Sequence, residues 1–580
     1  LTGMAGMVSV SNAVNVSPDG TGQVLLYPYY SARGGNDTLI SIVNSSGNGK
    51  AVKVRFREAI NSRDVLDFHV YLSPYDVWTA AVTADDDTDG AKLMIGDTSC
   101  TVPYFYGDDG EQEFLDFDYN FAGNGAAKTG ATVDGGPTGI ERTASGYIEV
   151  IEMGSLNDTP LKATVVDKDV DGNYNGKVIA GKEGDYVAWA VKHTAGVPND
   201  CQALVNAWTE NAPATANLGD EWIDTPTTGI NAPTGGLYGA ASIINVADGT
   251  MFSYKATAID NFYTSHSHKE PGLDSPNLLD SGDVTHSYVF ADVAAGVAVN
   301  NSDTTGSVSK PPVAIKNTWK VKDGEDASGS VATGKLRSDS FAAMLALNAT
   351  ITAEKMMNEF TTDATAGAHT EWVVTFPTKK FHTDAGPIAP FTSTWNTKTG
   401  APACEDISYT YWDREEASST SPAATVPPVV SPKDPSVEDP DLFSLCREAN
   451  VIRFASDETY PDATEIFKEP KREGTRYGFN NFELSDAYSE GWMEFNFASV
   501  PAGSKASGPR QSVPADEVND LSGVSVHPDY QEDQKAVYKG LPVIGFAATT
   551  YTNGNLGDGV LANYGGTFQH RTSRSIVSSS

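Results

Sequence analysis

The stretch Ala51-Val52-Lys53-Val54-Arg55-Phe56-Arg57 alternates apolar and charged side chains from Val52 onward. Successive side chains of a β-strand point to opposite faces of a sheet, so this alternation predicts a strand with one apolar and one charged face. We expect it to be half-buried, with the apolar face toward a core and the charged face toward water. This pattern therefore indicates a β protein.

Short segments of the same kind lie on either side of it at hairpin-like spacing. They are residues 24–27, 38–43, 67–72, 77–82 and 146–152. Several short strands at such intervals predict a β-sandwich. Residues 238–258 return to strands, with Ala247-Asp248-Gly249-Thr250 as the expected hairpin turn.

The second half of the chain carries a further set of strand signals. These segments are residues 371–378, 491–497 and 541–546, and the six prolines of 421–440 predict a surface loop between them. Two stretches favour helix instead. Residues 338–360 have a cap and apolar spacing, although 348–352 weaken the middle, and residues 197–208 have Asn199 or Asp200 as a cap.

These patterns predict a mainly β fold with two or more β-sandwich, immunoglobulin-like regions, long loop insertions and a small helical element. We expect an N-terminal sandwich over 1–260 with an acidic surface insertion at 83–145. A connecting region follows over 261–370 with its helix near 338–360. The C-terminal sandwich spans 371–580 and holds the proline-rich loop 421–440.

The charge balance excludes some partners. The chain has 40 basic and 76 acidic residues, a formal net charge of −36, yet only 20% of its residues are charged. Scarce lysine and arginine therefore cause the acidity. Such a surface repels nucleic acid and anionic membranes and attracts divalent cations, so we expect no nucleic-acid partner. The sequence also lacks an apolar run long enough to span a membrane, and its start at Leu1-Thr2-Gly3 fits a mature exported protein.

Oxygen-bearing side chains recur at every second position of Asp167-Lys168-Asp169-Val170-Asp171-Gly172-Asn173, and Asn175 continues the pattern. Ca²⁺ prefers about six to eight oxygen ligands, and glycine allows the sharp turn that brings them together. Val178 stands where an EF-hand has its bidentate Glu, so this is not a complete EF-hand loop. A second acidic run, 85–90, offers three more carboxylates. The candidate calcium ligands are Asp167, Asp169, Asp171, Asn173, Asn175, Asp85, Asp87 and Asp89; a solvated acidic turn is the alternative.

Four cysteines, Cys100, Cys201, Cys404 and Cys446, are far apart and form no CxxC motif. That spacing argues against zinc. An even count in an exported protein predicts two disulfides, and neighbours in sequence favour Cys100–Cys201 and Cys404–Cys446. Four buried free thiols are the alternative.

The motifs of common enzyme classes are missing, namely GxSxG, the P-loop, HExxH and the dinucleotide fingerprint. His266-Ser267-His268, with Glu270 and Asp274 nearby, could bind a metal or lie in a solvated loop. The pair Glu415-Glu416 imitates a glycosidase site only weakly, because carboxylates are abundant here. We therefore expect no enzyme.

Several segments resemble the S-layer proteins of marine gammaproteobacteria. The resemblance extends from residue 22 to about residue 570. It rests on residues 22–30, 53–58, 66–79, 357–360, 371–379, 413–416 and 540–546.

This resemblance implies a structural subunit that assembles with itself into a two-dimensional lattice, square in this family, on the outer surface of a Gram-negative cell, and that is also shed into vesicles and biofilm matrix. It supplies no catalytic residues. We expect Ca²⁺ to stiffen loops and to bridge acidic faces between subunits or to lipopolysaccharide phosphates. The alternatives are a filament-forming adhesin or pilus-like subunit, in which residues 1–20 donate a strand to a neighbour, and a secreted hydrolase.

Overall fold

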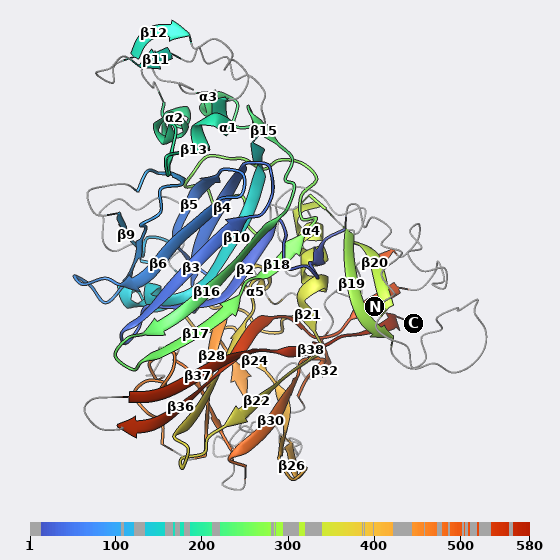
Figure 1. Ribbon diagram of the computed structural model, residues 1–580. Coiled ribbons are helices and arrows are strands. Elements are labelled where there is room, and N and C mark those ends of the chain that lie inside the picture. Colours follow the sequence, from blue (N-terminus) through green and yellow to red (C-terminus); the bar gives the residue numbers. More distant parts are fainter. Residues whose placement is uncertain are drawn as a thin grey trace, which may run out of the picture.

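Figure 1 shows the computed structural model, which is mainly β, with 48% of residues in strands and 9% in helices. This confirms the predicted fold class; the immunoglobulin-like topology stays a prediction. The structure describes residues 13–105, 110–120, 134–156, 166–168, 174–178, 186–210, 221–279, 283–284, 286–293, 313–319, 339–384, 387, 389–397, 399–420, 443–456, 459–471, 478–484, 488–501, 504, 508–510, 519–520, 535–555 and 561–579.

Two antiparallel sheets from the first half of the chain pack face to face. The eight-stranded sheet has the order β1-β18-β2-β10-β4-β5-β8, with β15 on β10, and the six-stranded sheet has the order β17-β16-β3-β6-β7-β9. The eight-stranded sheet contains β1 (Asn15–Val16), β2 (Val24–Ser31), β4 (Lys50–Glu58), β5 (Asp64–Leu72), β8 (Cys100–Val102), β10 (Ser145–Leu156), β15 (Ile230–Asn231) and β18 (Thr257–Asp260). The six-stranded sheet contains β3 (Asn36–Asn44), β6 (Val77–Ala84), β7 (Ala91–Met94), β9 (Glu111–Glu113), β16 (Leu237–Asn245) and β17 (Thr250–Lys255).

The alternation in residues 51–57 correctly predicts strand β4, but the strand is not half-buried. Val52, Val54 and Phe56 face the core between the sheets, as expected, yet every residue of β4 is buried. The charged face is covered by the segment around Leu273, whose carbonyl oxygen accepts hydrogen bonds from the Lys53 and Arg55 side chains. The prediction failed because period-two alternation distinguishes two faces but cannot tell water from a polar neighbour.

The described parts of the acidic insertion at 83–145 include short strands. Strands β7, β8 and β9 arise from it and extend both sheets, and the 3-10 helix η1 (Ile140–Ala144) ends it. Strands of three or four residues are too short to show periodicity, which is why the sequence did not reveal them.

The second half of the chain forms two further sheets, with orders β26-β25-β30-β22-β38 and β29-β28-β23-β36-β37. The first contains β22 (Lys355–Thr361), β25 (Ser408–Asp413), β26 (Ser418–Thr420), β30 (Glu490–Asn496) and β38 (Arg571–Ser573). The second contains β23 (Ala368–Thr375), β28 (Ala449–Ala455), β29 (Asn480–Glu483), β36 (Ile544–Asn555) and β37 (Leu561–Gln569). Trp372 lies buried between them, with its ring centroid 5.4 Å from that of Phe495.

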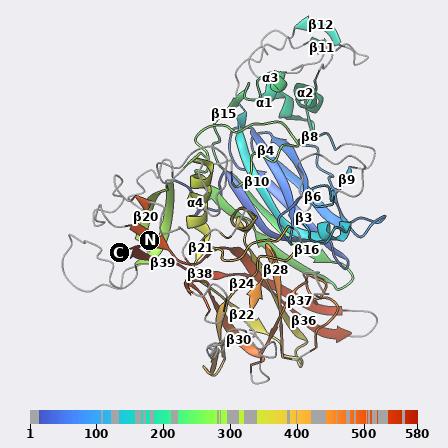
Figure 2. The same ribbon diagram turned by 180° about the vertical axis from the view of Figure 1, so that it is seen from behind.

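The two pairs of sheets share a continuous core (Figure 2). Tyr254 of β17 stacks on Phe546 of β36 at 4.5 Å between ring centroids, and the Thr375 hydroxyl donates to the Pro28 carbonyl oxygen at 2.6 Å. Borders near 260 and 370 therefore stay predictions, since buried side chains from both halves belong to one apolar cluster.

A fifth sheet, of order β33-β20-β19-β39-β34, gathers the described ends of the chain (Figure 1). Its strands are β19 (His286–Val293), β20 (Val313–Trp319), β33 (Asn519–Asp520), β34 (Lys535–Tyr538) and β39 (Ser575–Ser579). Short two-stranded ribbons pair β11 (Val166–Lys168) with β12 (Tyr174–Val178), β13 (His193–Thr194) with β14 (Val197–Pro198), β21 (Thr352–Ala353) with β35 (Leu541–Pro542), β24 (Glu405–Asp406) with β27 (Ser444–Leu445), and β31 (Ser499–Val500) with β32 (Gly508–Pro509).

The helix expected near 338–360 is shorter than predicted. Helix α4 covers Asp339–Ile351, and the chain then turns into β21 and β22. Asn348, Thr350 and Thr352 are poor helix formers, and strand pairing of β22 with β30 takes over beyond them. The short helix in 197–208 is confirmed as α2 (Cys201–Ala207), capped by the Asp200 carboxylate. The other helices are α1 (Tyr186–Val191), α3 (Glu221–Asp224) and α5 (Lys379–Thr383).

Candidate functional site

Most of the predicted calcium loop at 167–175 falls outside the described residues. Strands β11 and β12 pair as an antiparallel hairpin that carries Asp167 and Asn175, whereas Asp169, Asp171 and Asn173 are not described. The calcium site there stays a prediction.

The second acidic run lies in the turn between β6 and β7. Asp85 is nearly buried and accepts hydrogen bonds from the Thr88 hydroxyl at 2.6 Å and from the Asp87 backbone N–H, while the Asp87 and Asp89 side chains are exposed. Within the described part of the chain, no group of three or more His, Cys, Asp or Glu side chains is placed to hold a metal. The three carboxylates are thus not brought together in this structure.

Both predicted disulfides are present. Cys100–Cys201 ties β8 to the start of α2, and Cys404–Cys446 ties the residue before β24 to the residue after β27. Each bond joins elements that already pack together, so the disulfides close long loops onto the sheets. The alternative of free thiols is excluded.

The two candidate metal-binding histidines point to different surroundings. His266 is exposed, whereas His268 is buried in an aromatic cluster with Tyr71, Trp208 and Trp222. The Tyr71 hydroxyl lies 2.8 Å from His268 Nε2, and burial lowers the pKa of His268 to about 4. His268 is therefore a neutral core residue at pH 7.

The carboxylate pair at 415–416 sits on an exposed hairpin turn between β25 and β26. The Asp413 side chain accepts hydrogen bonds from the Glu415 and Ala417 backbone N–H groups, which fixes the turn. Neither Glu415 nor Glu416 lines the grooves described below. The pair has the structure of a solvated turn.

The outer face of the six-stranded sheet carries a contiguous patch without charge, which we call the neutral face. Strands β3, β6 and β16 pair in a register that aligns their outward positions in rows, Tyr238↔Val43↔Val77 being one such row. The neutral face consists of Leu39, Ser41, Val43, Val77, Thr79, Ala81, Met94, Tyr238, Ala240 and Ser242.

Large apolar side chains of the neutral face are open to solvent. Leu39 is 45% exposed, Tyr238 and Val77 are each 44% exposed, and Met94 is 40% exposed. Between them the small residues leave a depression of about 530 Å³. Contiguous exposed apolar surface of this kind marks an interaction site more often than scattered single residues do.

Among the described residues, charged side chains border the neutral face: Lys255 of the edge strand β17 lies opposite Ala240. Asp37 and Lys255 lie two residues beyond Leu39 and Ser253 on their strands, and Asp97 accepts hydrogen bonds from Thr79. Lys92 pairs with Asp86 and Glu111 beside Met94. The arrangement is an apolar centre with a polar rim, which is the usual anatomy of a protein interface.

The sequence predicted the strands of this face but not the face itself. Residues 38–43 read as an apolar run, and only the register with β16 shows that Leu39, Ser41 and Val43 join a larger uncharged surface. The detectable signal was the absence of Lys, Arg, Asp and Glu from 38–43, 77–82 and 237–245 in a chain of net charge −36.

Within the part of the chain that the structure describes, no helix is long and apolar enough to cross a membrane. No family model matches this chain, and comparisons with curated proteins and with solved structures gave no match either.

Proposed function

We propose that this protein is a structural S-layer subunit that assembles with its own copies into a two-dimensional lattice on the outer surface of a Gram-negative cell. The observation that carries the proposal is the neutral face on an otherwise strongly acidic molecule. The resemblance of the sequence to S-layer proteins of marine gammaproteobacteria also supports the proposal.

Charge decides which partner the neutral face accepts. Two copies of a chain with net charge −36 repel each other wherever their acidic surfaces meet. The neutral face removes that repulsion locally, and burying its apolar atoms contributes about 25 cal/mol for each Å². A second copy of the same chain, meeting this face with its own, satisfies both conditions.

A sheet face that meets its own copy makes a two-fold contact, in which the same patch is used on both sides. Two sheets can pack in this way about 10 Å apart, as they do inside β-sandwiches. One two-fold contact gives only a dimer. A lattice, square in the proposed family, therefore needs a second contact elsewhere on the molecule.

Calcium supplies that second kind of contact in our proposal. Carboxylates of the 167–175 loop would bind Ca²⁺, and the exposed Asp87 and Asp89 of the 85–89 turn would do so together with carboxylates of a neighbouring subunit, so that the ions neutralise acidic surfaces between subunits. The same ions would bridge the layer to lipopolysaccharide phosphates. The layer would then also be released with vesicles and into biofilm matrix.

The build of the subunit suits a place outside the cell. Both disulfides persist in oxidising surroundings, and the shared core gives one stiff body rather than loosely linked parts. Rigid subunits favour regular arrays because each contact then has a single geometry.

Electron microscopy of the purified protein tests the calcium part of this proposal. With millimolar CaCl₂ we expect ordered sheets, and we expect EDTA to dissolve them into small, discrete particles. Sheets that persist in EDTA would support the lattice but contradict the calcium bridges between subunits. Fibres would favour the filament subunit, and dispersed monomers under every condition would contradict assembly itself.

A further inference from the structure

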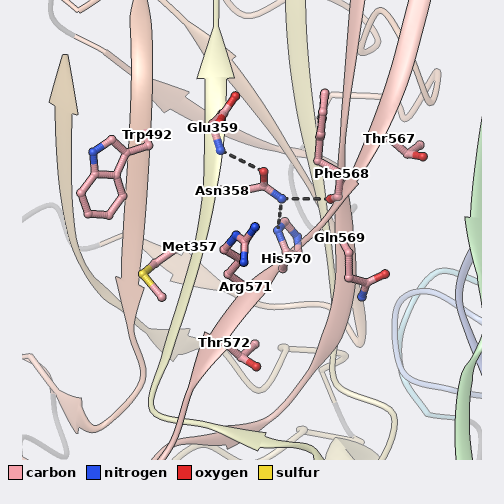
Figure 3. Close-up of a pocket in the computed structure, with 10 residues that line it drawn as sticks. All are labelled: Met357, Asn358, Glu359, Trp492, Thr567, Phe568, Gln569, His570, Arg571 and Thr572. Atoms are coloured by element: carbon pink, nitrogen blue, oxygen red, sulfur yellow. Dashed lines mark hydrogen bonds between the residues drawn. The ribbon is translucent and has the colours of Figure 1, made fainter. Parts of the chain in front are cut away.

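A groove of about 820 Å³ opens where the chain passes from β37 in one C-terminal sheet to β38 in the other (Figure 3). Its floor is the edge of β22 at Met357, Asn358 and Glu359, and the turn from Phe568 to Thr572 forms one side. The volume lies within the usual range of ligand sites, about 300–1,000 Å³. The groove is far in sequence from the neutral face and uses other strands.

Trp492 forms the opposite wall. Across the outer face of this sheet, Trp412 pairs with Trp492 and Trp492 pairs with Glu359. The two indole rings stack 4.0 Å apart with an interplanar angle of 10°, so Trp412 covers one face of the Trp492 ring. Trp492 is 37% exposed and lines the groove, whereas Trp412 does not.

Phe568 is a second aromatic residue of the lining and lies on the other side of the groove from Trp492 (Figure 3). Phe568 is 51% exposed. Exposed aromatic rings on two sides of one groove are costly to keep in water unless they have a ligand to cover them.

The polar groups of the groove are available. Glu359 and Arg571 are both exposed, and neither side chain makes a hydrogen bond or an ion pair with any residue that the structure describes. This contrasts with the neighbouring Lys355 on the same strand, which pairs with Glu494 at 2.8 Å. Carboxylate and guanidinium are planar groups that can each engage two adjacent hydroxyls.

The turn beneath these groups is fixed by a buried histidine. His570 Nδ1 lies 3.0 Å from Asn358 Nδ2, and His570 Nε2 lies 3.0 Å from the Val373 carbonyl oxygen. The Asn358 amide also donates to the Phe568 carbonyl oxygen at 2.9 Å, which holds the groove's side against its floor. These hydrogen bonds already hold the groove in place. A ligand would therefore have to order few groups when it binds, which lowers the entropy cost of binding.

From this geometry we infer that the groove binds a neutral chain of β-linked hexopyranose sugars. A pyranose ring with equatorial hydroxyls presents its axial C–H groups to a flat aromatic surface, as Trp492 and Phe568 offer. Its hydroxyls lie at the ring edge, where Glu359 and Arg571 can reach them. The opposite charges of these two residues balance, and the net charge of −36 disfavours a polyanionic glycan.

Titration calorimetry of the full chain with cellotetraose, laminaritetraose and β-galactotetraose tests this inference. We expect at least one of these oligosaccharides to bind with a Kd near or below about 1 mM. Trp492→Ala should weaken that binding at least about tenfold, and Arg571→Met should weaken it as well. Tyr238→Ala removes a comparably exposed aromatic ring from the neutral face and should leave the affinity unchanged.

Arg571→Met keeps the test decisive if Trp492→Ala disturbs the Trp412 stack, because the exposed Arg571 side chain has no partner among the described residues. Absence of binding by all three sugars at about 10 mM would overturn the inference. So would binding that both groove variants retain. Assembly is not needed for this measurement, so a negative result here says nothing against the lattice.

Discussion

Lys50 shows how single charges are kept inside this protein. Its ammonium donates to Glu152 Oε1 at 2.7 Å and to the Gly235 carbonyl oxygen at 2.7 Å, and both side chains of the pair are completely buried. Glu152 also accepts the Thr234 and Gly235 N–H groups at 2.9 and 2.8 Å. The Lys50–Glu152 pair is stable without water because each of its two charges meets several partners.

Removing one member of the Lys50–Glu152 pair should strongly destabilise the folded protein. Glu152→Ala leaves Lys50 buried without its counter-charge, and we expect the free energy of unfolding to fall by about 3–5 kcal/mol. Denaturant unfolding measures this loss of stability. The matched control is Asp462→Ala, which breaks the solvent-exposed Lys471–Asp462 pair and should lower the free energy of unfolding far less than Glu152→Ala does. Equal, small losses for both variants would mean that the Lys50–Glu152 pair is open to water.

At the scale of elements, the Cys404–Cys446 disulfide ties two short strands that could hardly pair alone. Strands β24 and β27 have two residues each, and Glu405 lies opposite Leu445 directly beside the bond. The sequence separation of 42 residues includes the proline-rich stretch 421–440. The disulfide therefore limits the freedom of a long loop at its base.

Replacing both cysteines by alanine should lower the free energy of unfolding by about 4 kcal/mol, because the unfolded chain regains the entropy of that loop. The Cys100→Ala/Cys201→Ala pair closes a longer loop of 101 residues and should lose slightly more, about 4–5 kcal/mol. Thermal and denaturant unfolding of both double variants provide the measurement. Unchanged stability in either variant would show that local packing alone holds these elements.

The sequence predicted secondary-structure elements better than it predicted tertiary contacts. Alternation in 51–57 and 146–152 predicted β4 and β10, and the cap at Asp200 predicted α2. Residues 348–352 indicated a weak point where α4 ends, but the strand that follows it and the covered face of β4 escaped prediction because both depend on partners distant in sequence. Local pattern records what a segment prefers, whereas tertiary contacts decide what covers it.

The candidate sites, too, were predictable where they depend on residues close in sequence and not where they depend on distant ones. Cysteine spacing predicted both disulfides, since only sequence neighbours had to be joined. The neutral face and the groove beside Trp492 were not predictable, because each is assembled from strands that are far apart in the chain. The calcium loop at 167–175 stays a prediction from its side-chain pattern.

At the scale of the whole molecule, charge and assembly are opposed. A net charge of −36 keeps copies apart in solution, and attraction can act only where the surface is uncharged or where ions intervene. The neutral face and the acidic loops would provide these two kinds of contact. In our proposal, assembly therefore depends on the neutral face, to which Leu39 belongs.

The most direct test compares Leu39→Glu with Leu273→Glu by electron microscopy and light scattering in millimolar CaCl₂. Both leucines are 45% exposed, so the two variants add the same charge with the same loss of apolar surface. We predict that Leu39→Glu remains folded but dispersed, whereas Leu273→Glu forms sheets like the unmodified chain. Ordered sheets formed by Leu39→Glu would contradict assembly through the neutral face.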